Sequence, residues 1–146
     1  MTATEARTTV QSVVEAHATH NTFYSIWSEV KERPTEPVFP FVAWEQWRGR
    51  LVDTPNGLAR AILIRLLIVT SVSTERTSAQ RDAAVEAADN AAADIVLRLQ
   101  RDHDWEISNV STSTLYDEKT QLDTGVVLTF TVTSDVLCYE PSHFTS

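Results

Sequence analysis

Residues 58–70, LARAILIRLLIVT, and residues 77–101, TSAQRDAAVEAADNAAADIVLRLQR, decide the fold of this chain. In the first segment, Ile62, Ile64, Leu66 and Ile68 alternate with residues that are also largely apolar. That pattern is typical of a central strand covered on both faces. The segment is too short to span a bilayer and carries Arg65 near its middle, whereas a spanning helix needs about 20 apolar residues. We therefore predict a central strand over 58–70.

The second segment has the period of a long helix. Thr77 and Gln80 fit a capping box at its start. Its apolar stripe is rich in alanine, so the helix can lie close to a flat surface, and we expect Ala88 and Ala92 to face a sheet while Asp89 faces solvent. The stripe and the opposite acidic face are formed by Arg81, Val85, Ala88, Ala92, Ile95 and Leu99 and by Asp82, Glu86 and Asp89. An all-α bundle is disfavoured because strand patterns flank the helix on both sides.

The chain before this unit predicts a helix and a strand. Residues 4–19 have helical spacing, and residues 21–37 fit either a helical turn or a strand that leads into a loop. Residues 38–52 alternate as a strand, and Pro40, which has no donor N–H, suits a sheet edge at the start of this strand. The turn Asp-Thr-Pro-Asn-Gly at 53–57 then predicts a hairpin with the central strand.

The chain after the long helix predicts two more strands. Residues 105–115 are rich in serine and threonine but alternate as a strand, residues 116–125 read as a polar loop, and residues 126–133 alternate clearly. Residues 134–146 are expected to be a loosely ordered tail. The whole pattern predicts a single α+β domain over 1–146, with a mostly antiparallel four-stranded sheet. The long helix packs on one face, and the N-terminal helix lies beside it or at an edge.

Composition limits the classes of function. The chain of 146 residues is long enough to bury one core, and a single cysteine allows no internal disulfide. No apolar signal-peptide core opens the sequence, so we expect synthesis and use in a cytoplasm, or assembly into a structure built there. Residues 1–74 hold seven acids and seven bases, whereas residues 75–146 hold thirteen acids and five bases. This balance disfavours gripping nucleic acid by its phosphates, although an acidic wall would let nucleic acid pass.

No motif in the sequence predicts catalysis. The chain lacks a nucleophile elbow, a glycine-rich phosphate loop and a zinc-protease motif. His17 and His20 stand three apart without a third strong ligand, which disfavours a metal site. The run Asp102-His103-Asp104 lies in a polar break, where solvent exposure is commoner than a catalytic role. We expect no enzyme activity, no cofactor and no metal.

The order of these elements and several of their short sequence segments resemble those of a known protein family. The chain has a Phe-Pro-Phe-Val strand, a Pro-Asn-Gly hairpin and a long helix that begins Thr-Ser-Ala-Gln-Arg-Asp-Ala. A polar strand and an acidic loop follow, and then Gly-Val-Val-Leu-Thr-Phe-Thr-Val. Over residues 4–140 this order is similar to the tail terminator and minor tail (neck) proteins of tailed bacteriophages. The resemblance implies one α+β domain, a hexameric ring at the head-proximal end of the tail tube, and no catalytic residues.

The resemblance also implies a role in the virion and a set of partner proteins. The ring would cap tube growth and join the tail to the neck in the virion, after assembly in the bacterial host cytoplasm. It would contact tail tube and connector proteins, let DNA pass without specific binding, and need no membrane. Interface candidates are the polar, uncharged edge residues Ser108, Ser111, Thr112, Ser113 and Thr114. Lumen or ring-contact candidates are Asp117, Glu118, Lys119 and Asp123, with the helix acids as the other choice.

Other functions remain open from the sequence. The chain could be a different head–tail connector, neck or minor tail protein. In another class, Trp44, Trp47, Arg48, Arg50 and Arg60 lie in one hairpin, and aromatics interleaved with bases can stack on single-stranded nucleic acid. Amphipathic side chains on a half-buried hairpin explain the same pattern more simply. A small enzyme or ligand carrier would instead need a convergent polar pocket.

Overall fold

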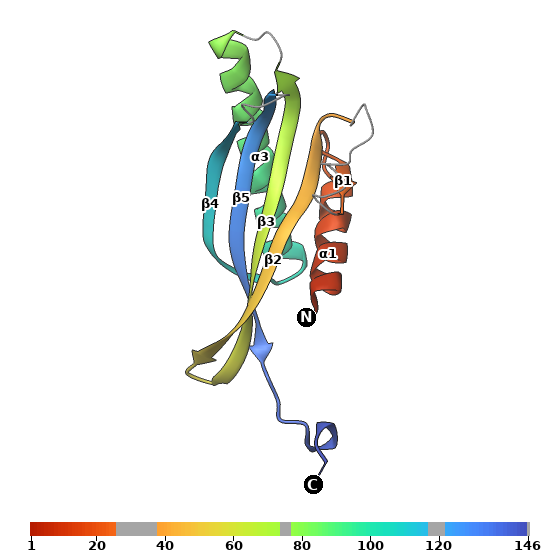
Figure 1. The fold of residues 1–146 in the computed structure, drawn as a ribbon, viewed down its shortest axis with the longest axis vertical. Helices are drawn as coiled ribbons and strands as arrows, with labels where there is room; N and C mark the ends of the chain where they lie inside the picture. Colours follow the sequence, from red (N-terminus) through yellow and green to blue (C-terminus); the bar gives the residue numbers. More distant parts are fainter. Residues whose placement is uncertain (26–37, 74–76, 117–121, 146) are drawn as a thin grey trace.

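A computed structural model describes residues 1–25, 38–73, 77–116 and 122–145. Figure 1 shows one α+β fold in which two helices lie against one face of a twisted sheet. The elements are α1 (Ala3–Glu15), β1 (Thr22–Tyr24), β2 (Phe41–Thr54), β3 (Gly57–Ser73), α3 (Ser78–Asp102), β4 (Glu106–Tyr116), β5 (Leu122–Val136) and the short 3-10 helix η1 (Pro141–His143). Within the described ranges, no helix is both long and apolar enough to cross a membrane.

The described sheet has five strands in the order β1-β2-β3-β5-β4. The four long strands are antiparallel neighbours, and β1 pairs with β2 in parallel. The predicted count of four strands is therefore wrong. The fifth strand comes from the region 21–37, whose conformation the sequence left open, and its three residues pair with the start of β2.

β3 is the central strand, as predicted, but its two faces are covered unequally. On the helix side, Ile62, Ile64, Leu66 and Ile68 are fully buried in the main core. On the other side, Leu67 and Val69 are buried in a smaller cluster with Phe41, Ala43 and Val127, which Tyr24, Phe39 and Leu115 border. Arg65, further along that face, is exposed. The prediction of full cover on both faces is therefore wrong at Arg65.

The helix layer follows from small side chains on α3. Ala88, Ala91 and Ala92 are buried against the sheet, which confirms the predicted close approach of the alanine stripe. The predicted capping box is also confirmed: the Gln80 backbone N–H donates to Thr77 Oγ1 at 3.3 Å, and the Thr77 N–H donates to Gln80 Oε1 at 3.2 Å. α1 lies beside α3 on the same face (Figure 1). Both helices therefore shield one face of the sheet and leave the other open.

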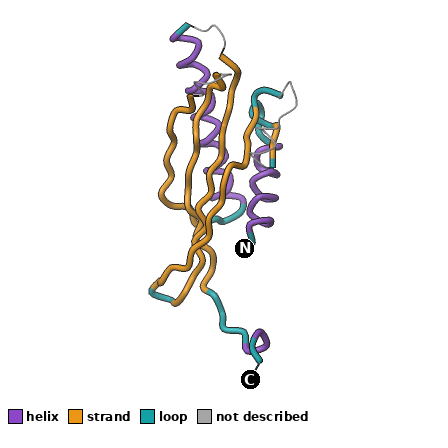
Figure 2. The backbone as a smooth tube through the Cα atoms, viewed as in Figure 1, coloured by secondary structure: helices purple, strands orange, loops and turns teal. Residues whose placement is uncertain are grey.

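The hairpin of β2 and β3 projects beyond the helices. Its two-residue turn lies between Thr54 and Gly57, as the sequence predicts, and the Thr54 hydroxyl donates to the Gly57 carbonyl at 2.7 Å. Gly57 has φ +127°, a conformation that other residues rarely adopt. Figure 2 shows the end of this hairpin beyond the helix layer, near the C-terminal segment. The strand begins at Phe41 instead of Val38, after Pro40.

The last two strands are longer than predicted. Tyr116 belongs to β4 and residues 122–125 belong to β5, so the predicted loop over 116–125 is wrong at both ends. At Gly125 an added Cβ would lie 1.9 Å from the Ile68 carbonyl oxygen, so this close strand contact requires glycine. β5 also continues through Val136, and the Leu137 N–H donates to the Leu58 carbonyl at 2.7 Å. The prediction of a loosely ordered tail from residue 134 is therefore wrong for residues 134–136, which belong to β5.

We expect Ala92→Leu to lower the free energy of unfolding by about 1–3 kcal/mol, because Ala92 is 1% exposed and added methyl groups would overpack the helix–sheet contact. Urea denaturation measures the change. Ala93→Leu is the matched control, since Ala93 is exposed on the outer face of the same helix and should tolerate the larger side chain. Equal destabilisation by the two variants would contradict this packing.

Candidate functional site

β4 forms one outer edge of the sheet. It pairs with β5 on one side and with no strand of the described residues on the other. All five interface candidates, Ser108, Ser111, Thr112, Ser113 and Thr114, are exposed there. Glu106 is the only charged residue in the strand. Natural sheets usually blunt an exposed edge with charge, proline or cover, so this strand offers backbone groups for pairing.

A bulge divides the candidate edge into two parts. Ser108 pairs with Thr131 and Ser111 with Thr129, so Asn109 and Val110 together oppose one residue of β5. Asn109 has φ +54°, in the left-handed region. Such a bulge bends an edge strand and interrupts its regular pairing. The regular part of the edge is therefore 111–116, and Ser108 lies apart from the other four candidates.

The side chains of the candidates point to opposite faces. Ser111 and Ser113 share a face with Thr129 and Val127, whereas Thr112 shares the helix side with Leu128. The Thr112 hydroxyl donates to Asp89 Oδ1 at 2.8 Å. Asp89 is exposed as predicted, but it is engaged with β4 and does not only face water. What the five residues share is therefore the backbone edge and not a common side-chain surface.

The predicted lumen residues are only partly placed. Asp117, Glu118 and Lys119 lie outside the described residues. The backbone of Asp123 belongs to β5 and lies opposite Val72, so its predicted loop position is wrong. The reason is the length of β5, which begins at Leu122 instead of Val126.

The other edge of the sheet belongs to β2. β1 pairs only with its first residues, Phe41 to Ala43. Beyond Ala43 the outer side of β2 pairs with no other described strand. The sheet therefore offers two edges, and sequence reasoning identified only the one on β4.

The tryptophan and arginine cluster does not form one surface. Trp44 is buried in the core at 5% exposure, and Trp47 is on the same side of the sheet but 45% exposed. Arg48 and Arg50 lie opposite Leu63 and Ala61 and therefore point to the open face. Because the exposed indole and these two guanidinium groups are on opposite faces, they cannot together hold a stacked base.

Arg48 and Arg50 instead line a groove on the open face of the sheet. The groove has a volume of about 420 Å³, and its other lining residues are Leu63, Asn109, Thr129 and Thr131. Arg65 on the same face is balanced by Glu45, 2.9 Å away, an ion pair by distance without an aligned hydrogen bond. Arg48 and Arg50 have no partner among the described residues. Their i, i+2 spacing on a strand was the sequence signal for this shared face.

The two histidines noted in the sequence join α1 to the core. His17 Nδ1 accepts the backbone N–H groups of Thr19 and His20 at 3.2 and 3.0 Å, so His17 Nε2 carries the proton and donates to Asp94 at 3.0 Å. The Thr70 hydroxyl donates to the Ala84 carbonyl at 2.8 Å and accepts from His20 Nε2 at 3.1 Å. Both rings therefore bind protein groups. The described residues contain no group of three or more His, Cys, Asp or Glu placed to hold a metal ion.

Burial keeps His20 neutral. His20 is only 2% exposed. Desolvation by this burial lowers the pKa of His20 below its usual 6.5, and the nearby charge of His17 lowers it further by a smaller amount. The neutral ring fits the hydrogen bonds to Thr19 and Thr70. This cluster therefore stabilises the fold in its uncharged form.

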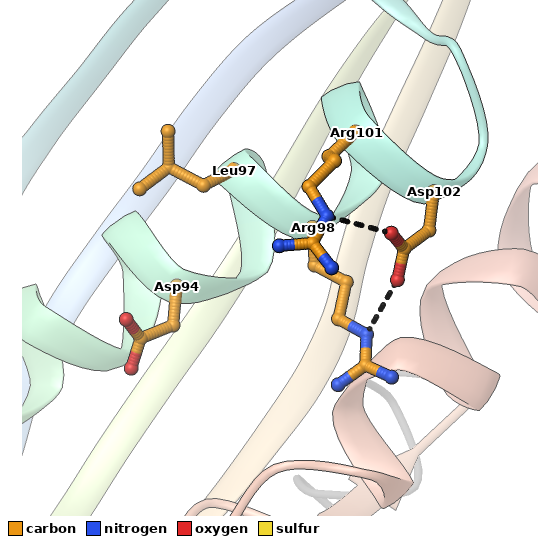
Figure 3. A pocket seen from close by; sticks show the side chains of 5 residues that line it. All are labelled: Asp94, Leu97, Arg98, Arg101 and Asp102. Carbon is orange, nitrogen blue, oxygen red and sulfur yellow. Dashed lines mark hydrogen bonds and ion pairs between the residues drawn. The ribbon is translucent and has the colours of Figure 1, made fainter.

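A hollow of about 300 Å³ on the outer face of α3 is occupied by its own ion pairs (Figure 3). Arg98 and Arg101 donate to the two carboxylate oxygens of Asp102, at 3.0 and 3.2 Å. Asp94, also in the hollow, binds His17. These bonds engage the carboxylates of Asp94 and Asp102 and the Nε groups of both arginines within the protein.

Comparison with known proteins assigns no family. No protein-family model matches the chain, and no curated protein matches it.

We expect the stability of the fold to depend on the protonation of His20. Because the folded state lowers the pKa of His20, its stabilising contribution is complete above pH about 6.5 and is lost as the pH falls below that value. The free energy of unfolding in urea, measured between pH about 7.5 and about 5, should therefore fall more steeply for the wild type than for His20→Gln. His103→Gln, at an exposed histidine, should keep the wild-type slope. Parallel slopes for the wild type and His20→Gln would contradict this account.

Proposed function

We propose that this chain is a structural protein of a bacteriophage tail. In this proposal, copies of the chain form a hexameric ring of the tail terminator kind at the head-proximal end of the tail tube. The ring stops tube growth and joins the tail to the neck. Tail tube protein and head–tail connector proteins are its partners in the virion. The proposal rests on the resemblance of the element order to that family, and a role as another neck or minor tail protein fits the same ring.

The exposed β4 edge is the observation that carries the assembly. A neighbouring strand or loop can add to an open edge through backbone hydrogen bonds without a special side-chain motif. The described sheet has two different edges, β4 and the outer side of β2. When the surfaces that meet are different, the contact is heterologous, and it closes into a ring if the rotation between copies is right.

The charge of the chain suits a channel for DNA. The formal charge of −8 comes entirely from residues 75–146. We propose that Asp117, Glu118 and Asp123 flank the lumen and repel phosphate groups, so that DNA passes without specific binding. The alternative of a single-stranded nucleic-acid-binding hairpin is less favoured, because Trp44 is buried and Trp47 faces away from Arg48 and Arg50. The proposed role needs no cofactor, metal or catalytic group.

We expect the double variant Ser111→Lys, Ser113→Lys to lose self-assembly, because two ammonium groups on an edge strand oppose the approach of a second strand. Sedimentation velocity over a concentration series measures the loss, and electron microscopy of the wild-type assembly should show rings. Both serines are exposed, so the variant should keep the wild-type melting temperature.

Asn90→Lys, Ala93→Lys is the control with the same added charge on the exposed side of α3. It should assemble like the wild type. Rings of undiminished stability in the β4 variant would rule out this edge as the contact. Images of virions that place a single copy away from the tail axis would rule out the proposed role.

A further inference from the structure

The two edges of the sheet carry opposite charges on the same face. Glu106 is the only charged residue of β4, and Arg48 and Arg50 are on β2. The register connects them across the sheet: Glu106 lies opposite Thr133, Thr133 opposite Ala61, and Ala61 opposite Arg50. Directly paired residues project to the same side, so the carboxylate and the guanidinium groups all project from the open face.

None of these three charges is neutralised within the described part of the chain. All three side chains are exposed, and no ion pair or hydrogen bond with another described residue engages them. Arg65, the other arginine on this face, already has Glu45. The unpaired acid and the unpaired bases therefore stand at opposite edges of one sheet, too far apart across the intervening strands to meet within one copy.

The strand directions allow the two edges of different copies to meet. β2, β3, β5 and β4 are successive antiparallel neighbours, so β2 and β4 run in opposite directions. A second copy placed beside the first by rotation about an axis along the strands would bring its β4 antiparallel to β2. Without a shift along the strands, Glu106 of one copy faces Arg50 of the other, and Ser108 faces Arg48.

We infer that β4 of one copy binds the outer side of β2 of a second copy, and that Glu106 pairs there with Arg48 and Arg50. This inference rests on the self-assembly proposed above and names the surface that the β4 edge meets. Side chains alternate along a strand, so only an even shift keeps Glu106 on the face of the arginines. A shift of two residues replaces Arg50 by Arg48 as the direct partner. The pair therefore sets the register of the contact as well as its charge complementarity.

Apolar side chains at both edges gain cover from the same contact. Val110 in the β4 bulge is 48% exposed, and Trp47 and Leu51 on β2 are exposed as well. Apolar area removed from water contributes about 25 cal/mol per Å² before the costs of association. The edge residues Ser111 to Thr114 carry no charge, so they do not repel an approaching strand. The second copy thus supplies a carboxylate for two free arginines and cover for exposed apolar groups.

Charge reversal tests the contact. Glu106→Arg alone, and Arg48→Glu, Arg50→Glu together, should each weaken self-assembly of the full chain at least about tenfold in sedimentation velocity, since like charges then face each other. The triple variant that combines them should return to within about threefold of the wild type. Glu140→Arg is the control, because it makes the same change of charge at an exposed position of the C-terminal segment and should assemble normally. Thermal unfolding should show that all variants remain folded.

The outcomes separate this contact from the ring itself. Weakening by both reversals with recovery in the triple variant supports the contact. If both charge-reversed variants assemble like the wild type, the contact is overturned but the proposed ring is not. The same conclusion follows if the triple variant assembles no better than either parent variant. If the charge reversals abolish salt-sensitive binding of the chain to DNA but leave self-assembly unchanged, the contact between copies is also overturned. A wild-type chain that is monomeric at every soluble concentration overturns the contact and the proposed ring together.

Discussion

The backbone hydrogen bonds at the edges of an open sheet are the constraint on which the rest of this structure depends. The four long strands satisfy one another, but the outer sides of β4 and of most of β2 find no strand among the described residues. An isolated domain usually protects such edges with charge or proline. On the open face, β4 carries one acid and β2 carries two arginines that have no partner among the described residues, so the edges are complementary there instead of repelling every strand that approaches.

The one-sided helix layer gives the sheet two different faces. α1 and α3 cover one face, so the main buried core lies between these helices and the strands. The other face has a small apolar cluster at one end and a polar groove with arginines, threonines and an asparagine further along. If neighbouring copies pair Glu106 with Arg48 and Arg50, the free positive charge on this face is neutralised.

Much of the fold could be predicted from the sequence, because the decisive patterns are local. The alternation around Ile62 to Ile68, the capping box at Thr77 and the turn before Gly57 each specify their own structure, and all are present. Strand ends were predicted less well. Asp123 and Thr124, two of the polar residues that suggested a loop before Gly125, form part of β5 because β3 continues opposite them through Ser73. β1 was left undecided, since three residues hold their conformation only through pairing with β2.

In the candidate site, too, the features set by local sequence could be predicted, whereas those set by pairing between strands could not. The β4 edge could be predicted from its lack of charge, but the bulge at Asn109 depends on the register with β5, which no local pattern gives. The separation of Trp47 from Arg48 and Arg50 follows from strand alternation, once residues 41–54 are known to be one strand. The relation of Glu106 to Arg50 spans four strands and could come only from the assembled sheet.

Hydrogen–deuterium exchange along β4 and β2, compared between monomer and assembled ring, tests the central claim most directly. If the sheet edges form the contact, outward-facing amides in residues 111–116 and 44–50 exchange quickly in the monomer and become protected in the ring. Amides of β3 should be protected in both states, because both neighbours of β3 lie within the same copy. Exchange along β4 that is equally fast in monomer and ring would contradict assembly through this edge.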